Sequence, residues 1–546
     1  MKKDKWLVTK SKKKDTYYVS IGISAGYGKG YKKLIGVGSL DELMKYHPDP
    51  INALKTECEN WDTEWDRNKL KPIIDDFLKK STNKIKITNY SLEILDKFIN
   101  KLKIFENMSS TKSKNVIDVL RYMLQKRIIE KSSIFRCFNT QEDTDTDLPV
   151  SKTSFYNALD YLFDNKEQIL KNVNNQLVSE NKRKLQVLWY DTTTAYFESF
   201  SRVGIRLPGF SKDGKFKEDQ VVIGLITDEN GIPLHYRLFP GNTTDSKTFI
   251  HFMLEMKRIY EIEKVVIVCD KGMSINANIR FLEAHGIDYI ISYRMKAGSK
   301  KVKEYVLKQD DYLNYSEDFK YKEQTYFSTW QNGRKTDKVR RRIISYSSSR
   351  ASKDRKEREN LINNFYKKAK NGMVSASDLN SIKKYKFFQK VNEDTLYKLN
   401  YDKIEEDEQF DGYYIYETSL LNISPSEIIS IYQKQWQIEE NFRVLKGTLE
   451  LRPMFVWTYK HIEAYVLLSF LALVVLKYAI YWIQEHYIKD SGLVENITVT
   501  KFLDTLKVAQ KITKEVNGIV VSVEYENSKK LNNDLQYIEK LVTKYM

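Results

Sequence analysis

Val187-Leu-Trp-Tyr-Asp-Thr-Thr-Thr194 and Lys264-Val-Val-Ile-Val-Cys-Asp-Lys-Gly272 are two short apolar runs that each reach an aspartate. Apolar runs of this length, rich in β-branched and aromatic residues, predict buried β-strands. A buried strand that ends on an unpaired carboxylate costs free energy unless the charge meets a cation. Asp191 and Asp270 are therefore candidate metal ligands, although an aspartate after a strand is equally typical of a helix N-cap or a turn.

The segments around these two runs predict a regular order of strands and helices. The expected elements are, in order, strands over 185–191, 221–227 and 234–239, a helix over 246–260, a strand over 264–270, a helix over 274–286 and a strand over 288–293. The second and third strands form a predicted hairpin across the turn at 228–231. This order is typical of a mixed α/β sheet.

A third carboxylate lies far downstream, in Tyr432-Gln-Lys-Gln-Trp-Gln-Ile-Glu-Glu-Asn-Phe-Arg-Val-Leu-Lys446. If this stretch is one α-helix with about 100° per residue, four polar residues share a stripe roughly 60° wide: Tyr432, Gln435, Glu439 and Lys446. An adjacent apolar stripe would anchor the helix on a core, so that Glu439 faces a cleft. Helix faces that mix Glu with Lys and Arg are also typical of solvated surfaces, but the two upstream aspartates favour the cleft.

Length and charge bound the class of protein. A chain of 546 residues with 41% hydrophobic and 30% charged residues is expected to fold into two to four domains. Its formal net charge of +17 suits a polyanionic partner. The three cysteines (Cys58, Cys137 and Cys269) form no zinc-binding pattern and are expected to be reduced thiols. The N-terminus has no apolar run behind its charges, so no secretory signal is expected.

One apolar segment, Ala464 to Trp482, is about long enough to cross a bilayer. It closely follows the Glu439 stretch, and nothing else in the sequence resembles it. We therefore expect a helix buried under the sheet, and no membrane partner.

Two further regions are candidates for nucleic-acid contact. Ser151-Lys-Thr-Ser-Phe-Tyr156 predicts a helix start and suits either a recognition helix or an ordinary packing helix. Gln324 to Trp330 predicts a strand of a hairpin turning at Asn332-Gly333, followed by the basic run Arg340-Arg341-Arg342 and a lysine-rich helix over 353–370. Tyrosines beside arginines are typical of surfaces that stack on and grip nucleic acid, and also of solvated edge strands.

The order of strand, Asp191, strand, Asp270, long β-rich insertion and helix with Glu439 resembles the catalytic core of DDE transposases with an RNase H-like fold. The stretch 432–446 resembles the Tyr-(2)-Arg-(3)-Glu-(6)-Lys signature of one large group of bacterial insertion-sequence transposases. Tyr432, Glu439 and Lys446 match it, whereas Gln435 stands where that group has arginine. The resemblance covers about residues 185–480, including Phe239-Pro-Gly-Asn-Thr-Thr-Asp245.

The resemblance implies a transposase that binds terminal inverted repeats and cuts and joins DNA. Asp191, Asp270 and Glu439 would be its catalytic carboxylates and would hold two Mg²⁺ ions, which Mn²⁺ can replace; hard oxygen ligands suit these metals. Its partners would be double-stranded terminal and target DNA and a second copy of the chain in a synaptic homodimer. The candidate DNA contacts are Tyr432, Gln435, Trp436, Arg443, Lys446, Arg340, Arg341 and Arg342.

The expected location is the bacterial cytoplasm, in association with the nucleoid. Two alternatives remain: an RNase H-like nuclease without strand transfer, and a catalytically silent DNA-binding descendant. The expected domains are a small β-rich region (1–84), a mainly helical DNA-binding region (85–184), the first part of an RNase H-like core (185–297), a β-rich insertion (298–420), the second part of the core (421–485), and a C-terminal region suited to dimerisation (486–546).

Overall fold

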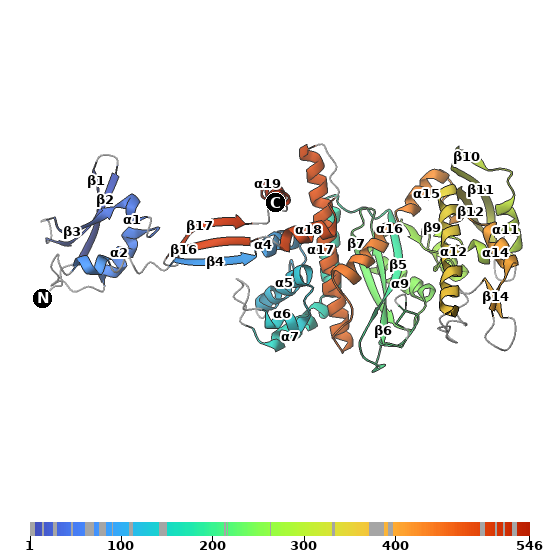
Figure 1. Ribbon diagram of the computed structural model, residues 1–546, viewed down its shortest axis with the longest axis horizontal. Coiled ribbons are helices and arrows are strands. Elements are labelled where there is room, and N and C mark those ends of the chain that lie inside the picture. Colours follow the sequence, from blue (N-terminus) through green and yellow to red (C-terminus); the bar gives the residue numbers. More distant parts are fainter. Residues whose placement is uncertain are drawn as a thin grey trace. The chain divides into compact units, whose positions relative to one another are not determined.

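The structure of the chain is a computed structural model (Figure 1). It describes residues 6–13, 16–25, 30–44, 47–59, 70–75, 83–89, 91–108, 113–140, 150–211, 214–215, 217–262, 264–329, 334–370, 387–390, 397–491, 497–507, 510–516, 519–526 and 532–546. The chain forms two compact units. The first comprises Met1–Lys97, Thr140–Pro149 and His486–Met546, and the second comprises Phe98–Asn139 and Val150–Glu485.

The first unit begins with a three-stranded antiparallel sheet of β1 (Trp6–Lys13), β2 (Thr16–Ser24) and β3 (Tyr31–Ser39). The short helix α1 (Leu40–Leu43) and the helix α2 (Pro50–Glu59) follow it. Apolar side chains of the sheet and of both helices form one buried cluster that includes Val19, Ile21, Ile35, Leu43 and Leu54. The alternation of apolar and polar residues along β2 thus gives this sheet one core-facing side.

A second sheet of the first unit joins distant parts of the sequence. The strand β4 (Asn83–Asn89) pairs antiparallel with β16 (Gln510–Val516), which pairs in turn with β17 (Ile519–Glu526). The helices α18 (Val499–Lys507) and α19 (Asn532–Tyr545) lie on either side of this hairpin in the sequence. Figure 1 shows the three strands side by side.

Helices dominate the first part of the second unit. They are α4 (Ser91–Lys101), which begins in the first unit, α5 (Ser113–Glu130), α6 (Ile134–Asn139), α7 (Lys152–Asp164) and α8 (Lys166–Ser179). Ser151 occupies the N-cap position of α7, as expected. Phe155 on α7 is buried and packs edge-on against Tyr122 of α5 and Phe138 of α6. One face of α7 therefore packs on its helical neighbours.

A nine-stranded mixed sheet is the centre of the second unit, with the order β10-β11-β12-β15-β9-β8-β5-β6-β7. The strands are β5 (Val187–Tyr196), β6 (Gln220–Thr227), β7 (Pro233–Pro240), β8 (Val266–Cys269), β9 (Asp288–Ser292), β10 (Leu313–Ser316), β11 (Phe319–Thr329), β12 (Lys335–Ser347) and β15 (Tyr413–Thr418). The sheet contains the strands and the hairpin that the sequence predicts.

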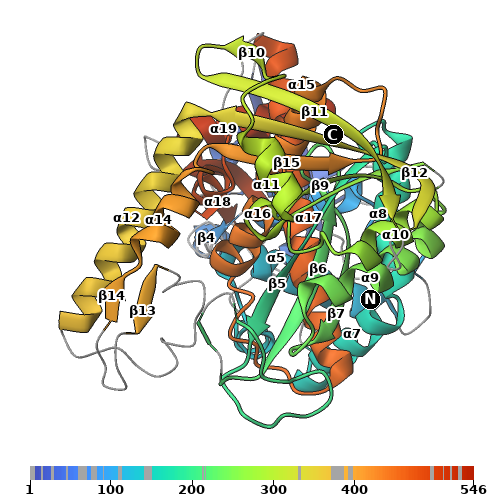
Figure 2. The same cartoon turned by 90° about the vertical axis from the view of Figure 1, so that its right-hand side faces the viewer.

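Five of these strands form an RNase H-like core. The strands β5, β6 and β7 pair antiparallel with one another in that order. On the other side of β5, β8 pairs parallel with β5, and β9 pairs parallel with β8. Figure 2 shows β5, β6 and β7 side by side. The predicted fold class, a mixed α/β sheet with an RNase H-like core, is confirmed.

The region predicted as a β-rich insertion extends the core sheet. The last core strand β9 pairs antiparallel with β15, and β15 pairs with β12, so the strands of 313–347 continue outward from β9. The remaining elements of this region are α11 (Lys300–Leu307), α12 (Ser348–Lys370), β13 (Phe388–Lys390), β14 (Tyr397–Leu399) and α14 (Tyr401–Glu408). The lysine-rich helix expected over 353–370 is therefore present as α12, while the predicted turn at Asn332-Gly333 lies outside the described residues.

Helices cover both faces of the core strands. On one face, α9 (Asp245–Tyr260) and α10 (Asn276–Ala284) pack on the buried cluster of β5, β6 and β8. The other face meets α15 (Pro425–Gln433) and α16 (Trp436–Arg443). This second face carries the candidate site.

The long apolar segment is a helix of the protein interior. It belongs to α17 (Tyr459–Ser491), and 83% of its most apolar window is buried inside the protein. Phe470 of α17 packs on the ring of Tyr236 in β7, with ring centroids 5.0 Å apart. The length and composition of this helix are those of a membrane span, but its burial is that of a core helix.

Candidate active site

Asp191 and Asp270 lie at matching positions on two neighbouring parallel strands. The register of β5 and β8 pairs Tyr190 with Cys269, and each aspartate is the next residue of its chain. Because paired strands lie about 4.8 Å apart, the two aspartates lie side by side.

Both carboxylates point to the same face of the sheet. Side chains alternate along a strand, and Tyr190 and Cys269 belong to the buried cluster under α9, so Asp191 and Asp270 belong to the opposite face. Trp189 shares that face, and its indole Nε1 donates to the carbonyl of Ile431 in α15 at 3.1 Å. The face with both aspartates is therefore the one that α15 contacts.

The strand β5 does not end at Asp191 as predicted, but continues to Tyr196. After Tyr190, β5 no longer pairs with β8, which ends at Cys269. It continues to pair with β6 as far as Tyr196. The β-branched residues Thr192 to Thr194 favour the extended backbone that this pairing requires. A strand prediction from apolar content alone stops too early, because these threonines are buried although they are polar.

Backbone amides orient both carboxylates. Asp191 Oδ1 accepts from the N–H of Thr192 at 2.7 Å, and Asp270 Oδ1 accepts from the N–H of Lys271 at 2.6 Å. Burial raises the pKa of the Cys269 thiol well above its ordinary value, and the charges of Asp270 and Asp191 raise it further. The two negative charges thus act together on the end of β8.

Glu439 comes to this face on α16, which packs against β5 and β6. The buried side of the helix includes Ile438 and Phe442, while Glu439 itself is exposed. Asn441 anchors the helix, because its Nδ2 donates to the carbonyl of Gly231 in the β6–β7 turn at 3.0 Å. The third predicted carboxylate therefore lies on the surface of a helix whose buried side is held by the core sheet.

The stretch 432–446 is not one regular helix, so the predicted stripe of four polar residues is wrong. The N–H of Gln435 bonds to the carbonyl of Tyr432 at 3.0 Å, a tight turn between α15 and α16. In a continuous helix that N–H would bond to Ile431, whose carbonyl instead accepts from Trp189. Residues Val444–Thr448 form a π-helix, which changes the angular spacing again before Lys446.

Tyr432 is buried in the protein interior. Its hydroxyl shares a hydrogen bond of 2.9 Å with that of Tyr414 in β15, and its ring packs edge-on against Tyr416. Burial raises the pKa of Tyr432, and the nearby Tyr414 and Asp270 raise it further. The structure thus places Tyr432 against β15, with most of its side chain buried.

The other candidate DNA contacts of this stretch differ in exposure. Trp436 is 57% exposed, and the side chain of Arg443 is 79% exposed, with Glu440 3.8 Å away. Lys446 is half-buried, and Gln435 is buried in the tight turn. Of these four, Trp436 and Arg443 are therefore the ones that present most of their side chains to solvent.

The three consecutive arginines of β12 are neutralised inside the protein. Arg340 pairs with Glu283 at 2.7 Å and with Glu417 at 3.4 Å, and Arg342 pairs with Glu417 at 3.2 Å. Arg341 pairs with Glu323. Because these ion pairs link β12 to α10, β15 and β11, the structure gives the arginine run a structural role.

A further carboxylate near the site is Asp245, which the sequence analysis includes only as the last residue of the segment Phe239–Asp245. Its Oδ1 accepts from the Thr192 hydroxyl at 2.6 Å, and a side chain added at Gly272 would lie 3.8 Å from its Oδ2. Asp245 therefore contacts the residue after Asp191 and lies beside the segment after Asp270. The packing of α9 against β5, which brings these segments together, is the signal that the sequence lacks.

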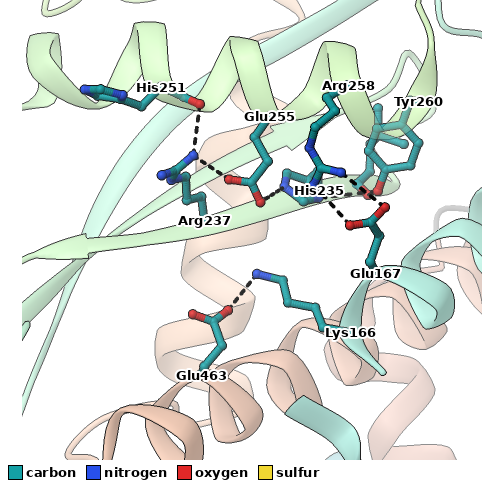
Figure 3. Close-up of polar contacts among 10 residues, drawn as sticks. Lys166, Glu167, His235, Arg237, His251, Glu255, Arg258, Tyr260 and Glu463 are labelled. Carbon is teal, nitrogen blue, oxygen red and sulfur yellow. Dashed lines mark hydrogen bonds and ion pairs between the residues drawn. The ribbon is translucent and has the colours of Figure 1, made fainter. Parts of the chain in front are cut away.

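A polar network holds the helix that carries Asp245 (Figure 3). Glu255 of α9 lies between two residues of β7, with its carboxylate 3.3 Å from His235 Nε2 and 2.5 Å from Arg237 Nη1. Lys166 of α8 pairs with Glu463 of α17 at 2.6 Å. Burial alone would raise the pKa of Glu255, but its hydrogen bond to His235 and the neighbouring positive charges lower it to about 2. These contacts fix α9 against the edge of the sheet.

The donors at the site suit a hard divalent cation. Asp191 and Asp270 offer carboxylate oxygens, the ligands that Mg²⁺ and Mn²⁺ prefer. Within the part of the chain that the structure describes, no three His, Cys, Asp or Glu side chains converge closely enough to hold one metal ion together. The matching positions of Asp191 and Asp270 after paired residues of β5 and β8 suit such an ion.

Comparisons with known proteins give one family model and several solved structures that are similar to this chain. A family model described as "Transposase DDE domain" matches residues 182–475, more than half of the chain. The cryo-EM structure of the piggyBac transposase synaptic complex with hairpin DNA aligns over 83% of this chain and 84% of that chain, with 10% identity and a TM-score of 0.37. The Mos1 transposase paired-end complex with left transposon end aligns over 43% and 70%, with 11% identity and a TM-score of 0.15. No curated protein matches significantly.

Proposed function

Since the chain belongs to the transposase DDE domain family, we propose that it binds the terminal inverted repeats of a bacterial insertion sequence and moves the element by cut-and-paste transposition. Transposase function follows from the family itself. The binding of terminal repeats and the cut-and-paste route are the finer part of the proposal. Its setting would be the bacterial cytoplasm, at the nucleoid.

The observation that carries the proposal is the placement of Asp191 and Asp270. They follow paired residues on two parallel strands and share the face that α15 and α16 cover. A phosphodiester carries negative charge, so two carboxylates in one place disfavour its approach unless cations stand between them. This is the arrangement expected of a metal-dependent phosphoryl-transfer site.

The proposed roles of the three acidic residues follow from their positions. Asp191, Asp270 and Glu439 would hold two Mg²⁺ ions, and Mn²⁺ would substitute. When bound, such a pair of ions supplies an activated nucleophile and stabilises the leaving oxygen. The amides of Thr192 and Lys271 hold the carboxylates in fixed orientations. Because Glu439 is exposed on α16, its carboxylate is accessible from the side on which DNA would arrive.

The proposed partners are double-stranded terminal DNA, target DNA and a second copy of the chain in the synaptic complex. The exposed Trp436 and Arg443 are the proposed DNA contacts nearest Glu439, with Lys446 one to two turns further along. Tyr432, Gln435 and Arg340 to Arg342 are left out of this role, because their side chains are largely buried in the protein.

One observation favours a second candidate, a catalytically silent DNA-binding descendant. Within the described residues, no three His, Cys, Asp or Glu side chains form a group that could hold one metal ion. A nuclease without strand transfer would share the same three carboxylates. The reaction products therefore distinguish the candidates: joined transposon–target DNA for a transposase, cleaved DNA alone for a nuclease, and neither for the silent protein.

The decisive experiment uses DNA ends taken from the repeats that flank the gene. The wild-type chain should cleave and join them in Mg²⁺ or Mn²⁺, and Asp191→Asn should lose both reactions while it still binds the ends, since the substitution leaves the basic surfaces intact. Asp288→Asn, an exposed aspartate at the start of β9, is the matched control and should stay active. Full activity of Asp191→Asn, or activity in a chelator, would contradict the proposal.

A further inference from the structure

The first forty residues carry a large share of the positive charge of the chain. They contain ten lysines and two aspartates, a formal charge of +8 (10 − 2), whereas the whole chain carries +17. Within the strands, β1 and β3 together contribute Lys10, Lys12, Lys13, Lys32 and Lys33, and the three strands contain no acidic residue. A small sheet of this charge repels itself unless an anion is near.

The burial of the hairpin changes halfway along its strands. In β2 the four residues Val19–Gly22 are buried, and in β1 the residues Trp6–Thr9 are partly buried. Beyond them, Lys10–Lys13 and Tyr17–Tyr18 are exposed. We call the outer ends of the two strands, Lys10–Lys13 and Thr16–Tyr18, the basic ribbon. Because consecutive residues of a strand point to opposite faces, the exposed run shows that both faces of the ribbon are open.

The two tyrosines of the basic ribbon lie on opposite faces, each among polar neighbours. The ring of Tyr17 lies 5.3 Å from Lys10 Nζ and 6.0 Å from Lys12 Nζ, and it is 41% exposed. Tyr18, which is 42% exposed, pairs across the ladder with Ser11. Exposed tyrosines between lysines can contact sugars and bases while the lysines neutralise phosphates.

The helices that pack on the sheet of β1, β2 and β3 carry the opposite charge. The helices α1 and α2 contain four acidic residues, Asp41, Glu42, Glu57 and Glu59, and one lysine, Lys55. The segment from β1 to α2 is therefore basic along its sheet and acidic along its helices. Such a dipole orients a polyanion toward the strands and away from the helices.

From these observations we infer that the basic ribbon binds duplex DNA by lying in a groove, with its lysines on the phosphates. A two-stranded antiparallel ribbon fits the major groove of B-DNA, which is about 12 Å wide. The inference rests on the proposed function for the identity of the polyanion. It adds a DNA-binding element outside the helical region over 85–184, where the sequence places DNA binding.

The experiment compares two double variants of the full chain that remove the same charge. The first variant, Lys10→Gln/Lys13→Gln, changes the basic ribbon. The control, Lys55→Gln/Lys71→Gln, changes two exposed lysines in the helical residues that follow the sheet. Binding to a fluorescent mixed-sequence duplex is measured across a salt series. Since each lost phosphate contact reduces the slope of log K against log[salt] by about 0.9, the ribbon variant should lose about 1–2 units of slope. The control should stay parallel to the wild type.

The outcomes separate this inference from the proposed function. A ribbon variant parallel to the wild type, or a control that loses the same slope, overturns the inference and leaves the proposed function standing. A wild-type chain that binds no duplex at any salt concentration overturns both. All four lysines are exposed, and equal midpoints of thermal unfolding establish that both variants are folded.

Discussion

Adjacent residues of β5 point to opposite faces of the sheet at the candidate site. Tyr190 is buried under α9, whereas Asp191 faces α15 and Thr192 returns to the α9 side, where it donates to Asp245. The sequence identifies Asp191 and Asp270 because each follows an apolar run. It does not identify Asp245, because the contact depends on how α9 packs on β5. Residues linked only by packing have no periodic signal along the chain.

Thr192→Val tests the contact with Asp245. Without the hydroxyl, the half-buried carboxylate of Asp245 loses a charge-assisted hydrogen bond of 2.6 Å, and outer groups that support a metal site typically change activity about 10–100-fold. We expect DNA cleavage to fall by that order and DNA affinity to stay unchanged, with Thr192→Ser restoring cleavage. The measurement is the cleavage rate over a range of Mg²⁺ concentrations. Wild-type cleavage by Thr192→Val would show that Asp245 has no influence on the site.

Trp436→Ala tests the exposed indole near Glu439. Stacking of one base on an aromatic side chain contributes about 1–3 kcal/mol, so binding to a DNA end with unpaired bases should weaken about 5–150-fold. The salt dependence should not change, because tryptophan carries no charge. Leu254→Ala, which removes a side chain of α9 that is 46% exposed, is the control. Equal affinities of wild type and Trp436→Ala would remove Trp436 from the DNA-binding surface.

At the scale of elements, sequence periodicity predicts the core and fails at its irregularities. The hairpin of β6 and β7 and the helix α9 lie where the apolar spacing predicts them. The predicted helix over 432–446 is divided because a distant residue, Trp189, takes the carbonyl of Ile431. Its sequence contains no proline or glycine before Gly447, the usual breakers, so nothing local marks the division.

Glu255→Gln tests how the polar network fixes α9. The pKa of Glu255 is lowered from 4.5 to about 2 in the folded chain, so its carboxylate stabilises the fold above pH 4.5 and loses this effect as the pH falls toward 2. Burial lowers the pKa of His235, so protonation of the unfolded chain also destabilises the fold as the pH falls below 6.5.

At neutral pH the variant should therefore be less stable than wild type by about 1.5–3 kcal/mol, the range for a hydrogen bond to a charged group. The difference should shrink between pH 4.5 and pH 2. The measurement is denaturant unfolding of both proteins over this range. Glu304→Gln, an exposed residue of α11, should differ from wild type by a small amount at every pH. A difference for Glu255→Gln that does not depend on pH would contradict the assigned pKa.

At the scale of the whole molecule, the sheet is larger than the sequence suggests. The order of predicted elements separates a core from an insertion over 298–420, but β15 joins the two into one sheet of nine strands. Strand pairing over such distances follows from three-dimensional packing, which composition cannot reveal. The domain boundaries expected from the sequence stay predictions, and the structure divides the chain differently, into two units that each contain separate segments.

Burial of α17 predicts how the whole chain behaves when cells are broken. Its apolar window is 83% buried by other parts of the protein, so it offers little apolar surface to lipid. The full chain should appear in the supernatant after ultracentrifugation without detergent. Ala472→Asp, which places a charge at a fully buried position of α17, should shift the chain to the aggregated fraction. Recovery of the wild-type chain in washed membranes would contradict the burial of this helix.

The pairing of β4 with β16 sets the time at which the first unit is completed. Synthesis of the chain reaches Gln510 only 421 residues after Asn89 (510 − 89), and at about 5–20 residues per second this takes roughly 20–80 seconds. During that time the ribosome has already released the strands of the nine-stranded sheet, while β4 has not yet paired with β16. A chain that terminates before residue 510 can form the nine-stranded sheet but not the three-stranded sheet of β4, β16 and β17. Completion of the first unit thus reports that translation has passed β16 and β17.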